Sequence, residues 1–371
     1  MGVNGMEKTI TVLPGDGIGP EVTEAAVKVL QTIAKRYNHT FNLQFALIGG
    51  AAIDACQNPL PEETISLCSD SDAILLGAVG GPKWDQNPSH LRPEKGLLAI
   101  RKHFGLYANI RPVKAIPALL ESSPLKKEIA ENVDMVIVRE LTGGLYFAEP
   151  RKKTNDYALD TLVYTRNEIE RIVDTAFQLA RSRRGKLASV DKANVLDSSK
   201  LWREIVEEKK QGYPDVEVEH MLVDSTAMKL ITKPGAFDVI VTENMFGDIL
   251  SDEASVITGS LGMLPSASTR GDGFGLYEPV HGSAPDIAGQ NKANPAACIL
   301  SAAMMIREAF QMETEAAAIE EAVFNVLNDG YFTGDLQTNG KRVLSTSEWT
   351  DKVLDELDSE FVSESIMYSY V

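Results

Sequence analysis

The sequence predicts an α/β fold built from two interleaved α/β domains, and three observations lead to this prediction. Short apolar, β-branched runs alternate with segments of helical periodicity, which is typical of a largely parallel sheet covered by helices. The 371 residues are more than a single core usually holds, so two domains or one large elaborated unit is expected. No internal repeat and no low-complexity linker divides the chain, which favours domains that exchange segments.

The first hundred residues establish the alternation. β-branched runs predict strands, and apolar residues at helical spacing predict a helix whose first turn contains Pro20, a residue suited to that position. The expected elements are a strand at 8–13, a helix at 22–33, a strand at 41–48, a helix at 62–68, a strand at 73–78, a polar loop at 84–93 and a helix at 94–104.

Glycines between the first strand and helix resemble a dinucleotide-binding loop. The G-x-G-x-x-G pattern that begins at Gly15 needs a glycine where Pro20 stands, so the motif is incomplete. We therefore do not predict a Rossmann fold.

The middle of the chain continues the alternation, with one exception. Polar and apolar residues alternate over 147–165 around a turn near Asn155 and Asp156, which predicts an exposed two-stranded arm. Such a ribbon is barely stable alone, so we expect it to serve as a dimer contact. The other expected elements are strands at 107–113, 133–140, 186–190 and 216–222, and helices at 167–184, 198–211 and 226–231.

The last third begins with a strand at 237–242 and a helix that follows Asn244. We then expect a glycine-rich loop at 266–275 and three closing helices, at 295–310, 314–327 and 347–357.

The composition excludes several classes of partner. A net charge of −17 argues against binding to nucleic acid or to an anionic membrane. No apolar run could span a bilayer and the N-terminus lacks a signal-peptide core, so we expect a cytoplasmic or organelle-matrix protein. Cys56, Cys68 and Cys298 lack metal-ligand spacing, and we interpret them as reduced, mostly buried thiols.

Asp248 and Asp252 are the first candidates for chemistry. Four residues apart on a helix, they present both carboxylates on one face, where Mg²⁺ or Mn²⁺ would relieve their repulsion. Such a pair is more often a solvated acidic face. Here five apolar neighbours leave little of the helix to face water: Ile249, Leu250, Ala254, Val256 and Ile257.

Three arginines near the ends of elements, Arg101, Arg111 and Arg139, could bind a substrate with several carboxylates, because guanidinium groups bind carboxylates in a bidentate manner. Each of them alone could equally form a surface salt bridge. Lys192 follows a strand, and a lysine held near a cation favours the neutral form that acts as a general base. Asp224, at the end of another strand, could be a third metal ligand, although either residue alone could be an ordinary polar residue at a strand end.

These residues occur in ordered blocks that resemble the β-decarboxylating dehydrogenases, the isopropylmalate and isocitrate dehydrogenase family, over nearly the whole chain. The blocks are LPGDGIGPEV (13–22), GLLAIRK (96–102), RELTGGLYF (139–147), DKANVL (191–196), VDSTAM (223–228), ENMFGDILSDEAS (243–255) and EPVHGSAPDIAGQNKANP (278–295).

The resemblance implies two interleaved α/β domains around a central cleft, in an obligate homodimer whose hairpin arms interlock. Residues 1–106 and 259–371 would form the cofactor-binding domain. Residues 107–258 would form the dimerisation and metal/substrate domain, including the arm near 147–165.

The resemblance also implies a role for each candidate. Arg101, Arg111 and Arg139 would bind the malate carboxylates, Tyr146 would be the general acid and Lys192 the base. Asp248, Asp252 and Asp224 would hold Mg²⁺ or Mn²⁺, with Lys192 and Asp224 coming from the partner subunit.

By the same resemblance NAD would lie along residues 281–294. Glu278 would be near the nicotinamide ribose and Asp286 on the adenosine ribose hydroxyls. The other residues that it places near the cofactor are Ile18, Glu94, His281, Gly282, Ser283, Ala284, Ile287 and Asn294.

The substrate pocket is expected to be apolar. Leu97 and Leu98 stand where isocitrate-type relatives carry serine or asparagine for an extra carboxylate, and Val195 of the partner subunit would close the pocket. This predicts 3-isopropylmalate as the substrate and leaves D-malate or tartrate as the alternative.

Two further alternatives belong to other functional classes. A catalytically silent regulatory subunit should have lost acid, base or metal residues, and none is lost here. A metal-dependent lyase without a redox step would leave the cofactor segment unexplained.

Overall fold

The structure is a computed structural model that describes residues 5–257, 259, 261–336 and 342–369, with the side chains of these residues except 261 and 359–369. One ten-stranded sheet runs through the molecule in the order β2-β1-β3-β12-β11-β4-β5-β10-β8-β9. Its strands are β1 Glu7–Gly15, β2 Thr40–Phe45, β3 Ala73–Ala78, β4 Ala108–Lys114, β5 Asp134–Glu140, β8 Lys186–Asp191, β9 Glu217–Leu222, β10 Val239–Thr242, β11 Pro265–Thr269 and β12 Gly275–Pro279.

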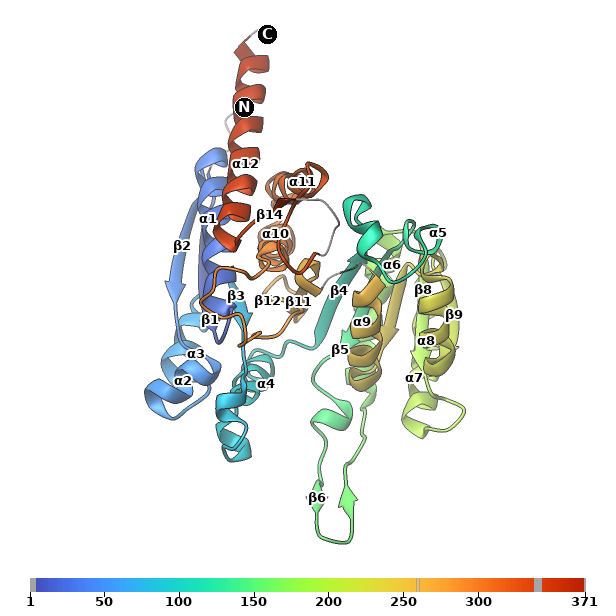
Figure 1. Ribbon diagram of the computed structural model, residues 1–371. Coiled ribbons are helices and arrows are strands. Elements are labelled where there is room, and N and C mark those ends of the chain that lie inside the picture. Colours follow the sequence, from blue (N-terminus) through green and yellow to red (C-terminus); the bar gives the residue numbers. More distant parts are fainter. Residues whose placement is uncertain (1–4, 258, 260, 337–341, 370–371) are drawn as a thin grey trace.

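The α/β prediction is confirmed, and the sheet is largely parallel. β4 and β11 run antiparallel to their neighbours, whereas the other adjacent strands of this sheet are parallel. Figure 1 shows β1, β2 and β3 with their helices on one side and β8 and β9 on the other, with β4 and β5 between them. The domain boundaries that the sequence suggests, at 106/107 and 258/259, stay a prediction.

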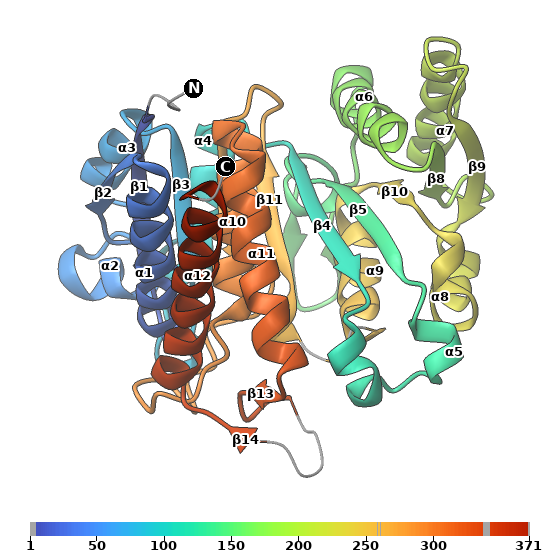
Figure 2. The ribbon, with the colours of Figure 1, turned by 90° about the horizontal axis from the view of Figure 1, so that it is seen from above.

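Helices cover both faces of the sheet. Their bounds are α1 Gly19–Tyr37, α2 Gly49–Cys56, α3 Glu62–Ser69, α4 Pro93–His103, α5 Lys127–Ala130, α6 Arg166–Ser182, α7 Asp197–Lys210, α8 Val223–Thr232, α9 Asn244–Ile257, α10 Ala296–Phe310, α11 Glu313–Asn328 and α12 Thr346–Ser369. Seen from above, α1, α12, α10 and α11 lie next to one another on one face (Figure 2). None of the helices in the described part of the chain is both long and apolar enough to cross a membrane.

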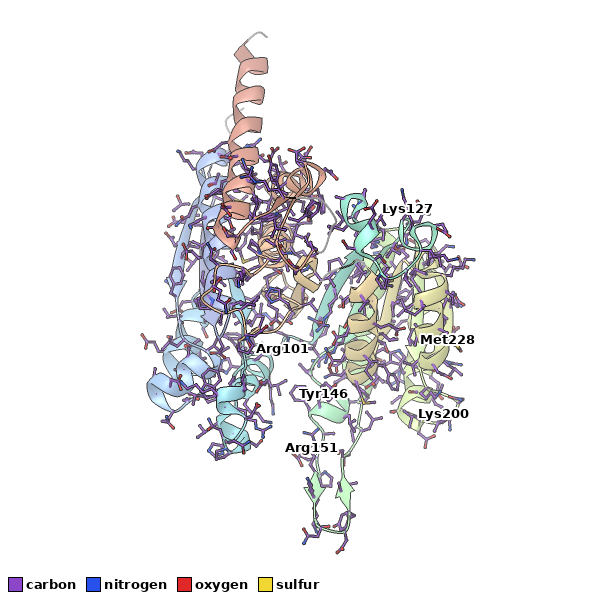
Figure 3. All side chains as sticks on the ribbon, viewed as in Figure 1. Arg101, Lys127, Tyr146, Arg151, Lys200 and Met228 are labelled. Carbon is purple, nitrogen blue, oxygen red and sulfur yellow. The ribbon has the colours of Figure 1, made fainter. Side chains whose placement is uncertain are left out.

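The predicted arm is present. β6 Lys152–Lys153 and β7 Ala158–Leu159 form a separate antiparallel ribbon that projects away from the body (Figure 1), and Arg151 lies just before it (Figure 3). Thr154 closes its turn, because its Oγ1 accepts hydrogen bonds from the backbone N–H groups of Asp156 and Tyr157. A second small sheet pairs β13 Tyr331–Phe332 with β14 Arg342–Val343.

The prediction of a glycine-rich loop over the whole of 266–275 was wrong, because half of this segment is sheet. β11 lies between β4 and β12, and only residues 270–274 form the turn. Its small polar residues are buried yet satisfied, since Asn109 Nδ2 donates to Ser266 Oγ at 2.9 Å and to the Ala267 carbonyl at 3.2 Å. A strand with this composition has no apolar signal, so its pairing depends on a residue far away in the sequence.

The strand expected at 41–48 ends earlier, at Phe45, and the next helix, α2, was not predicted. Asp16 fixes the start of this helix, because its carboxylate accepts the N–H groups of Gly50 at 2.8 Å, Ala51 at 2.7 Å and Gly80 at 2.8 Å. The short α5 was also missed, and α12 extends beyond its expected end at 357.

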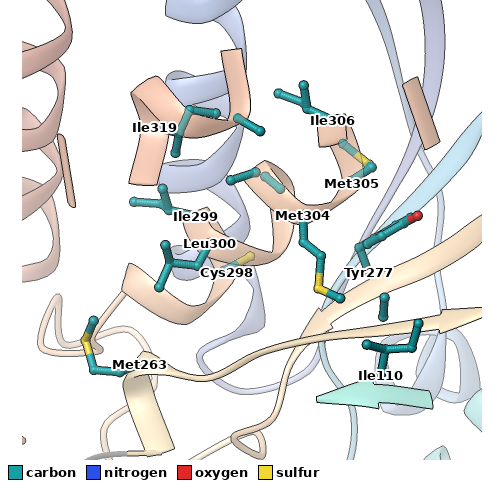
Figure 4. Packing of buried hydrophobic residues seen from close by; sticks show 14 of the residues in the cluster. Ile110, Met263, Tyr277, Cys298, Ile299, Leu300, Met304, Met305, Ile306 and Ile319 are labelled. Atoms are coloured by element: carbon teal, nitrogen blue, oxygen red, sulfur yellow. The ribbon is translucent and has the colours of Figure 1, made fainter. Parts of the chain in front are cut away.

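A continuous apolar core joins the two ends of the sheet. Buried residues of α1 and α10 pack with those of β4, β5 and α6 in one cluster. Figure 4 shows the side chains of α10, among them Cys298 and Met304, above the strands that carry Ile110 and Tyr277. Cys68 and Cys298 are buried and Cys56 is exposed, and all three are free thiols, as expected.

Candidate active site

The sheet itself brings two of the predicted arginines together. In the β4–β5 pair Asn109 stands opposite Arg139, and Arg111 lies two residues further along β4. Because side chains alternate between faces, Asn109, Arg111 and Arg139 share one face. Arg111 Nε donates to Asn109 Oδ1 at 2.8 Å, which holds the guanidinium against the sheet.

Helix α9 lies over this face and carries the predicted metal ligands. It approaches closely at Gly247, where a Cβ would come within 2.6 Å of Arg139 Cγ. One turn apart, Asp248 pairs with Arg139 and Asp252 Oδ1 lies 3.2 Å from Arg111 Nη1. The two carboxylates therefore face the arginines, and each arginine is paired with a predicted metal ligand.

The expectation that apolar residues leave little of this helix to face water was wrong. Leu250, Ala254 and Ile257 are buried, but Ile249 is 58% exposed and Val256 is 52% exposed. The helix is apolar on more than one side, and a single chain covers only the side toward the sheet. Its outer apolar side is available for another surface.

Tyr146 contacts the Asp248 carboxylate. It ends the 3₁₀ turn η4 Gly144–Tyr146 at the base of the arm (Figure 3), and its hydroxyl donates to Asp248 Oδ2 at 2.9 Å. Burial, followed by this hydrogen bond, raises the pKa of the Tyr146 phenol. The hydroxyl therefore keeps its proton, as its predicted role of general acid would require.

Burial dominates the electrostatics of the arginines. It lowers the pKa of Arg139 to about 10, and it lowers that of Arg111, with Asp248 opposing the shift in both cases. Arg139 is only 4% exposed. A cation held this far from water binds an anion more strongly than a surface arginine does, because solvent screens it less.

The third predicted arginine, Arg101, lies on α4, across from Tyr146 (Figure 3). Its Nη2 lies 2.6 Å from Glu278 Oε1 of β12, and both side chains are buried. Arg101 Nε is buried without a hydrogen-bond partner among the described residues, which leaves a donor for a ligand. Leu97 and Leu98, one turn earlier on α4, are half-buried.

Lys192 and Asp224 form a separate pair. Lys192 follows β8, Asp224 lies in the first turn of α8, and Lys192 Nζ is 2.7 Å from Asp224 Oδ1. The lysine lowers the pKa of the Asp224 carboxyl. Within the described residues, no group of three His, Cys, Asp or Glu side chains could hold a metal, so Asp224 does not complete a metal site with Asp248 and Asp252 in the same chain.

A cavity of about 840 Å³ lies beside the segment predicted to bind the cofactor. Ile18 lines it, and so do seven residues of the predicted segment 281–294: His281, Ile287, Gln290, Asn291, Lys292, Ala293 and Asn294. The lining also includes residues that were not predicted: Gly262, Gly334, Asp335, Val343, Leu344 and Ser345. No sequence motif marks the last five of these, because they come from a different part of the chain.

The cavity contains polar groups suited to a nucleotide. His281 Nε2 is buried with no hydrogen-bond partner in the described part of the chain, and burial lowers the pKa of His281. Asn294 Nδ2 donates to Asp335 Oδ2 at 3.0 Å, and this hydrogen bond holds the amide in the cavity lining. A dinucleotide offers the polar groups that such an unpaired nitrogen would bind.

The remaining predicted cofactor residues do not line this cavity. Ser283 accepts the Ile18 N–H at 2.8 Å through its carbonyl, which ties the 281–294 segment to the loop before α1. Gly282, Ala284 and Asp286 belong to the same segment, and Glu94 is at the start of α4. Val195, predicted to close the partner's pocket, is 65% exposed.

Comparison with known proteins identifies the family to which this chain is similar. Residues 9–353 match the family model described as isocitrate/isopropylmalate dehydrogenase. The chain is 66% identical over 357 residues to a 3-isopropylmalate dehydrogenase of Heyndrickxia coagulans, which covers 95% of this chain and 98% of the relative. It is 60% identical over 360 residues to that of Bacillus subtilis, with 96% and 98% covered.

Solved structures give the same result. An isocitrate dehydrogenase of Methylococcus capsulatus superposes with a TM-score of 0.84 at 35% identity, over 94% of this chain and 99% of that one. A β-decarboxylating dehydrogenase of Thermococcus kodakarensis gives 0.77 at 36% identity, with 95% and 96% covered. The chain therefore belongs to the isocitrate/isopropylmalate dehydrogenase family.

Proposed function

We propose that the protein oxidises and decarboxylates 3-isopropylmalate to 4-methyl-2-oxopentanoate and CO₂ with NAD⁺, as a step of leucine biosynthesis. The observation that carries the proposal is a cluster on one face of the sheet, in which the arginines Arg111 and Arg139 meet Asp248, Asp252 and Tyr146. Relatives at 57–66% identity bear the name 3-isopropylmalate dehydrogenase, which supports the same substrate.

NADH formation tests the proposal directly. Purified protein is given 3-isopropylmalate, D-malate, tartrate or isocitrate with Mg²⁺ and NAD⁺, and kcat/KM is compared. The highest value is expected for 3-isopropylmalate. A preference for D-malate or tartrate would replace the substrate, and product release without NADH would replace the reaction class.

The chain's own residues divide the chemistry among them. Arg101, Arg111 and Arg139 bind the two malate carboxylates, since each guanidinium presents planar donors that match a carboxylate. Lys192 of the partner subunit takes the proton of the C2 hydroxyl, and Tyr146 gives a proton to C3 after CO₂ has left. When bound, the divalent cation would place positive charge at the C2 oxygen and NAD⁺ would accept the hydride.

The residues present fit both the divalent cation and NAD⁺. Asp248 and Asp252 offer hard carboxylate oxygens one helical turn apart, and Asp224 of the partner subunit would add a third. The unpaired His281 nitrogen and the adjacent cavity fit a dinucleotide. We assign the cofactor to the domain formed by residues 1–106 and 259–371, and the metal and substrate to residues 107–258.

A homodimer follows from the same proposal. α8 and α9 pack together and expose large apolar side chains: Met228, Ile231, Ile249 and Val256. The arm exposes three more: Tyr157, Leu159 and Val163. Exposed apolar side chains on neighbouring helices mark an interaction surface, and a second copy of this chain would cover them while bringing Lys192 and Asp224 to the other subunit. We place this dimer in the cytoplasm.

Leu97→Ser is expected to weaken 3-isopropylmalate more than malate. Burying an isopropyl group against Leu97 is worth roughly 1 to 3 kcal/mol, and malate has no such group to lose. The measurement is kcat/KM for both substrates, with malate serving as the internal control for damage to folding. Equal losses on both substrates would show that Leu97 does not face the substituent.

Asp286→Lys combined with Ile287→Tyr is expected to erode or reverse the preference for NAD⁺ over NADP⁺. Asp286 is an exposed anion that would repel a 2′-phosphate, and Ile287 lines the cavity. The ratio of kcat/KM for the two cofactors is the measurement. Asp329→Lys, an equal charge change at the end of α11, should leave the ratio unchanged. A constant ratio in the double variant would remove Asp286 from the ribose site.

A further inference from the structure

Asn244, the first residue of α9, lies between two parts of the site that the sequence motifs treat separately. Its side chain is buried, with the residue 1% exposed. Asn244 Oδ1 accepts from Arg139 Nη2 at 2.7 Å and from Arg139 Nε at 3.1 Å. Asn244 Nδ2 donates to the Gly143 carbonyl at 3.2 Å. One amide thus uses both of its ends, one on an arginine and one on the turn before Tyr146.

The contact with Arg139 fixes the plane of its guanidinium. Two of its N–H groups are held by Asn244, and this leaves Nη1 directed at Asp248. Because the amide is neutral, it adds no further negative charge beside Arg139, which already pairs with Asp248. A carboxylate at position 244 would accept the same two hydrogen bonds but would add such a charge.

The contact with Gly143 reaches the segment that carries the general acid. Gly143 directly precedes η4, whose last residue is Tyr146. The same turn is held from two other directions. Gly143 N–H donates to Glu140 Oε2 at 2.8 Å, and a Cβ on Gly144 would lie 2.3 Å from the Tyr164 hydroxyl oxygen. The turn before Tyr146 is therefore in contact with Glu140, Tyr164 and Asn244.

The start of α9 is anchored as well. The Asn244 N–H donates to the Tyr164 hydroxyl oxygen at 2.9 Å, and Tyr164 in turn donates to Glu243 Oε2 at 3.2 Å. Glu243 Oε1 accepts the Phe246 N–H at 3.0 Å. The backbone of Asn244 is therefore fixed independently of its side chain, so a side-chain substitution need not displace the helix.

We propose that Asn244 is a positioning residue that aligns Arg139 for the substrate carboxylate and Tyr146 for proton transfer to C3. The roles of Arg139 and Tyr146 rest on the proposed function, whereas the coupling through Asn244 rests on the contacts above. In the last step the C2–O–H of the enol becomes a carbonyl, the C2–C3 π electrons form a C–H bond with the Tyr146 proton, and the enol proton leaves to solvent. A misplaced Tyr146 allows solvent to protonate either face of C3.

The test compares Asn244→Asp, Asn244→Ser and the control Thr242→Val with the unmodified protein. Asn244→Asp keeps the shape of the side chain but cannot donate to Gly143, and Asn244→Ser is a smaller second variant. Thr242 Oγ1 donates to the Val190 carbonyl at 2.9 Å and is fully buried, so Thr242→Val removes a buried hydrogen bond two residues away.

Two measurements separate alignment from folding. Calorimetric titration of 3-isopropylmalate with Mg²⁺ and no NAD⁺ should show about 10- to 100-fold weaker binding in both Asn244 variants. Turnover in D₂O, with the keto acid reduced at once by a second dehydrogenase, should give deuterium on one face of C3 in the unmodified protein and on both faces in the variants. Thr242→Val should lower Tm while retaining affinity and facial selectivity.

Unchanged affinity and single-face deuteration in both Asn244 variants would overturn the proposal and leave Asn244 a structural residue. The same selectivity loss in Thr242→Val would overturn it too. Failure of the unmodified protein to oxidise 3-isopropylmalate would instead contradict the proposed function, so the two failures are distinct.

Discussion

Replacing Asp248 with asparagine is expected to lower kcat/KM by about 1,000-fold, the largest effect of any single isosteric change in this site. Asp248 accepts hydrogen bonds from Arg139 and from Tyr146, and it offers an oxygen to the predicted cation. Without the carboxylate charge the cation binds less well, and its positive charge no longer stabilises the reacting oxygen. That stabilisation is worth several kcal/mol, or about three powers of ten in rate.

The metal is tested apart from turnover. Binding of Mn²⁺, followed by its paramagnetic signal, should weaken strongly in Asp248→Asn. Glu253→Gln, the same chemical change on the same helix, is the matched control and should bind Mn²⁺ as the unmodified protein does. If Asp248→Asn retains Mn²⁺ affinity and loses only turnover, the carboxylate orients Tyr146 and does not bind a metal.

The sequence predicts those parts of the fold whose signals are local. β3 and β5 are runs of buried apolar residues, and their positions were found from composition alone. β11 was missed because its serines are satisfied by Asn109, which comes from another strand and lies more than 150 residues away along the chain. No window of sequence contains both partners of that contact.

The candidate site also contains residues that the sequence predicts and residues that only the structure reveals. The spacing of Asp248 and Asp252 predicts a shared helix face, and the structure gives each of them an arginine partner. Asn244 lies four residues before Asp248, yet its importance depends on Arg139 and Gly143, which only the sheet brings near. Chemistry-bearing residue types can be found from motifs, whereas the neutral residues that align them become visible only in three dimensions.

Mixed dimers of Lys192→Ala and Asp252→Ala are expected to recover about one quarter of wild-type activity, although each variant alone should be nearly inactive. In the structure Asp252 belongs to the Arg111 and Arg139 cluster, whereas Lys192 pairs with Asp224. If that pair serves the other subunit, a mixed dimer has one site with both lesions and one site with neither. Random re-pairing makes about half of the dimers mixed, each with one intact site of two.

The control mixes Lys192→Ala with Asp224→Ala. Because Lys192 Nζ lies 2.7 Å from Asp224 Oδ1, the two residues must reach a site together from one chain. Each site of this mixed dimer then carries one lesion, so no activity should return. Equimolar mixtures are unfolded and refolded, dimers are confirmed by mass, and NADH formation is measured. No recovery in the Lys192→Ala and Asp252→Ala mixture would mean that Lys192 and Asp252 serve a site from the same chain. Recovery in the control would mean that Lys192 and Asp224 serve different sites. Only donation across the two-fold axis separates Lys192 from Asp252 while keeping Lys192 with Asp224.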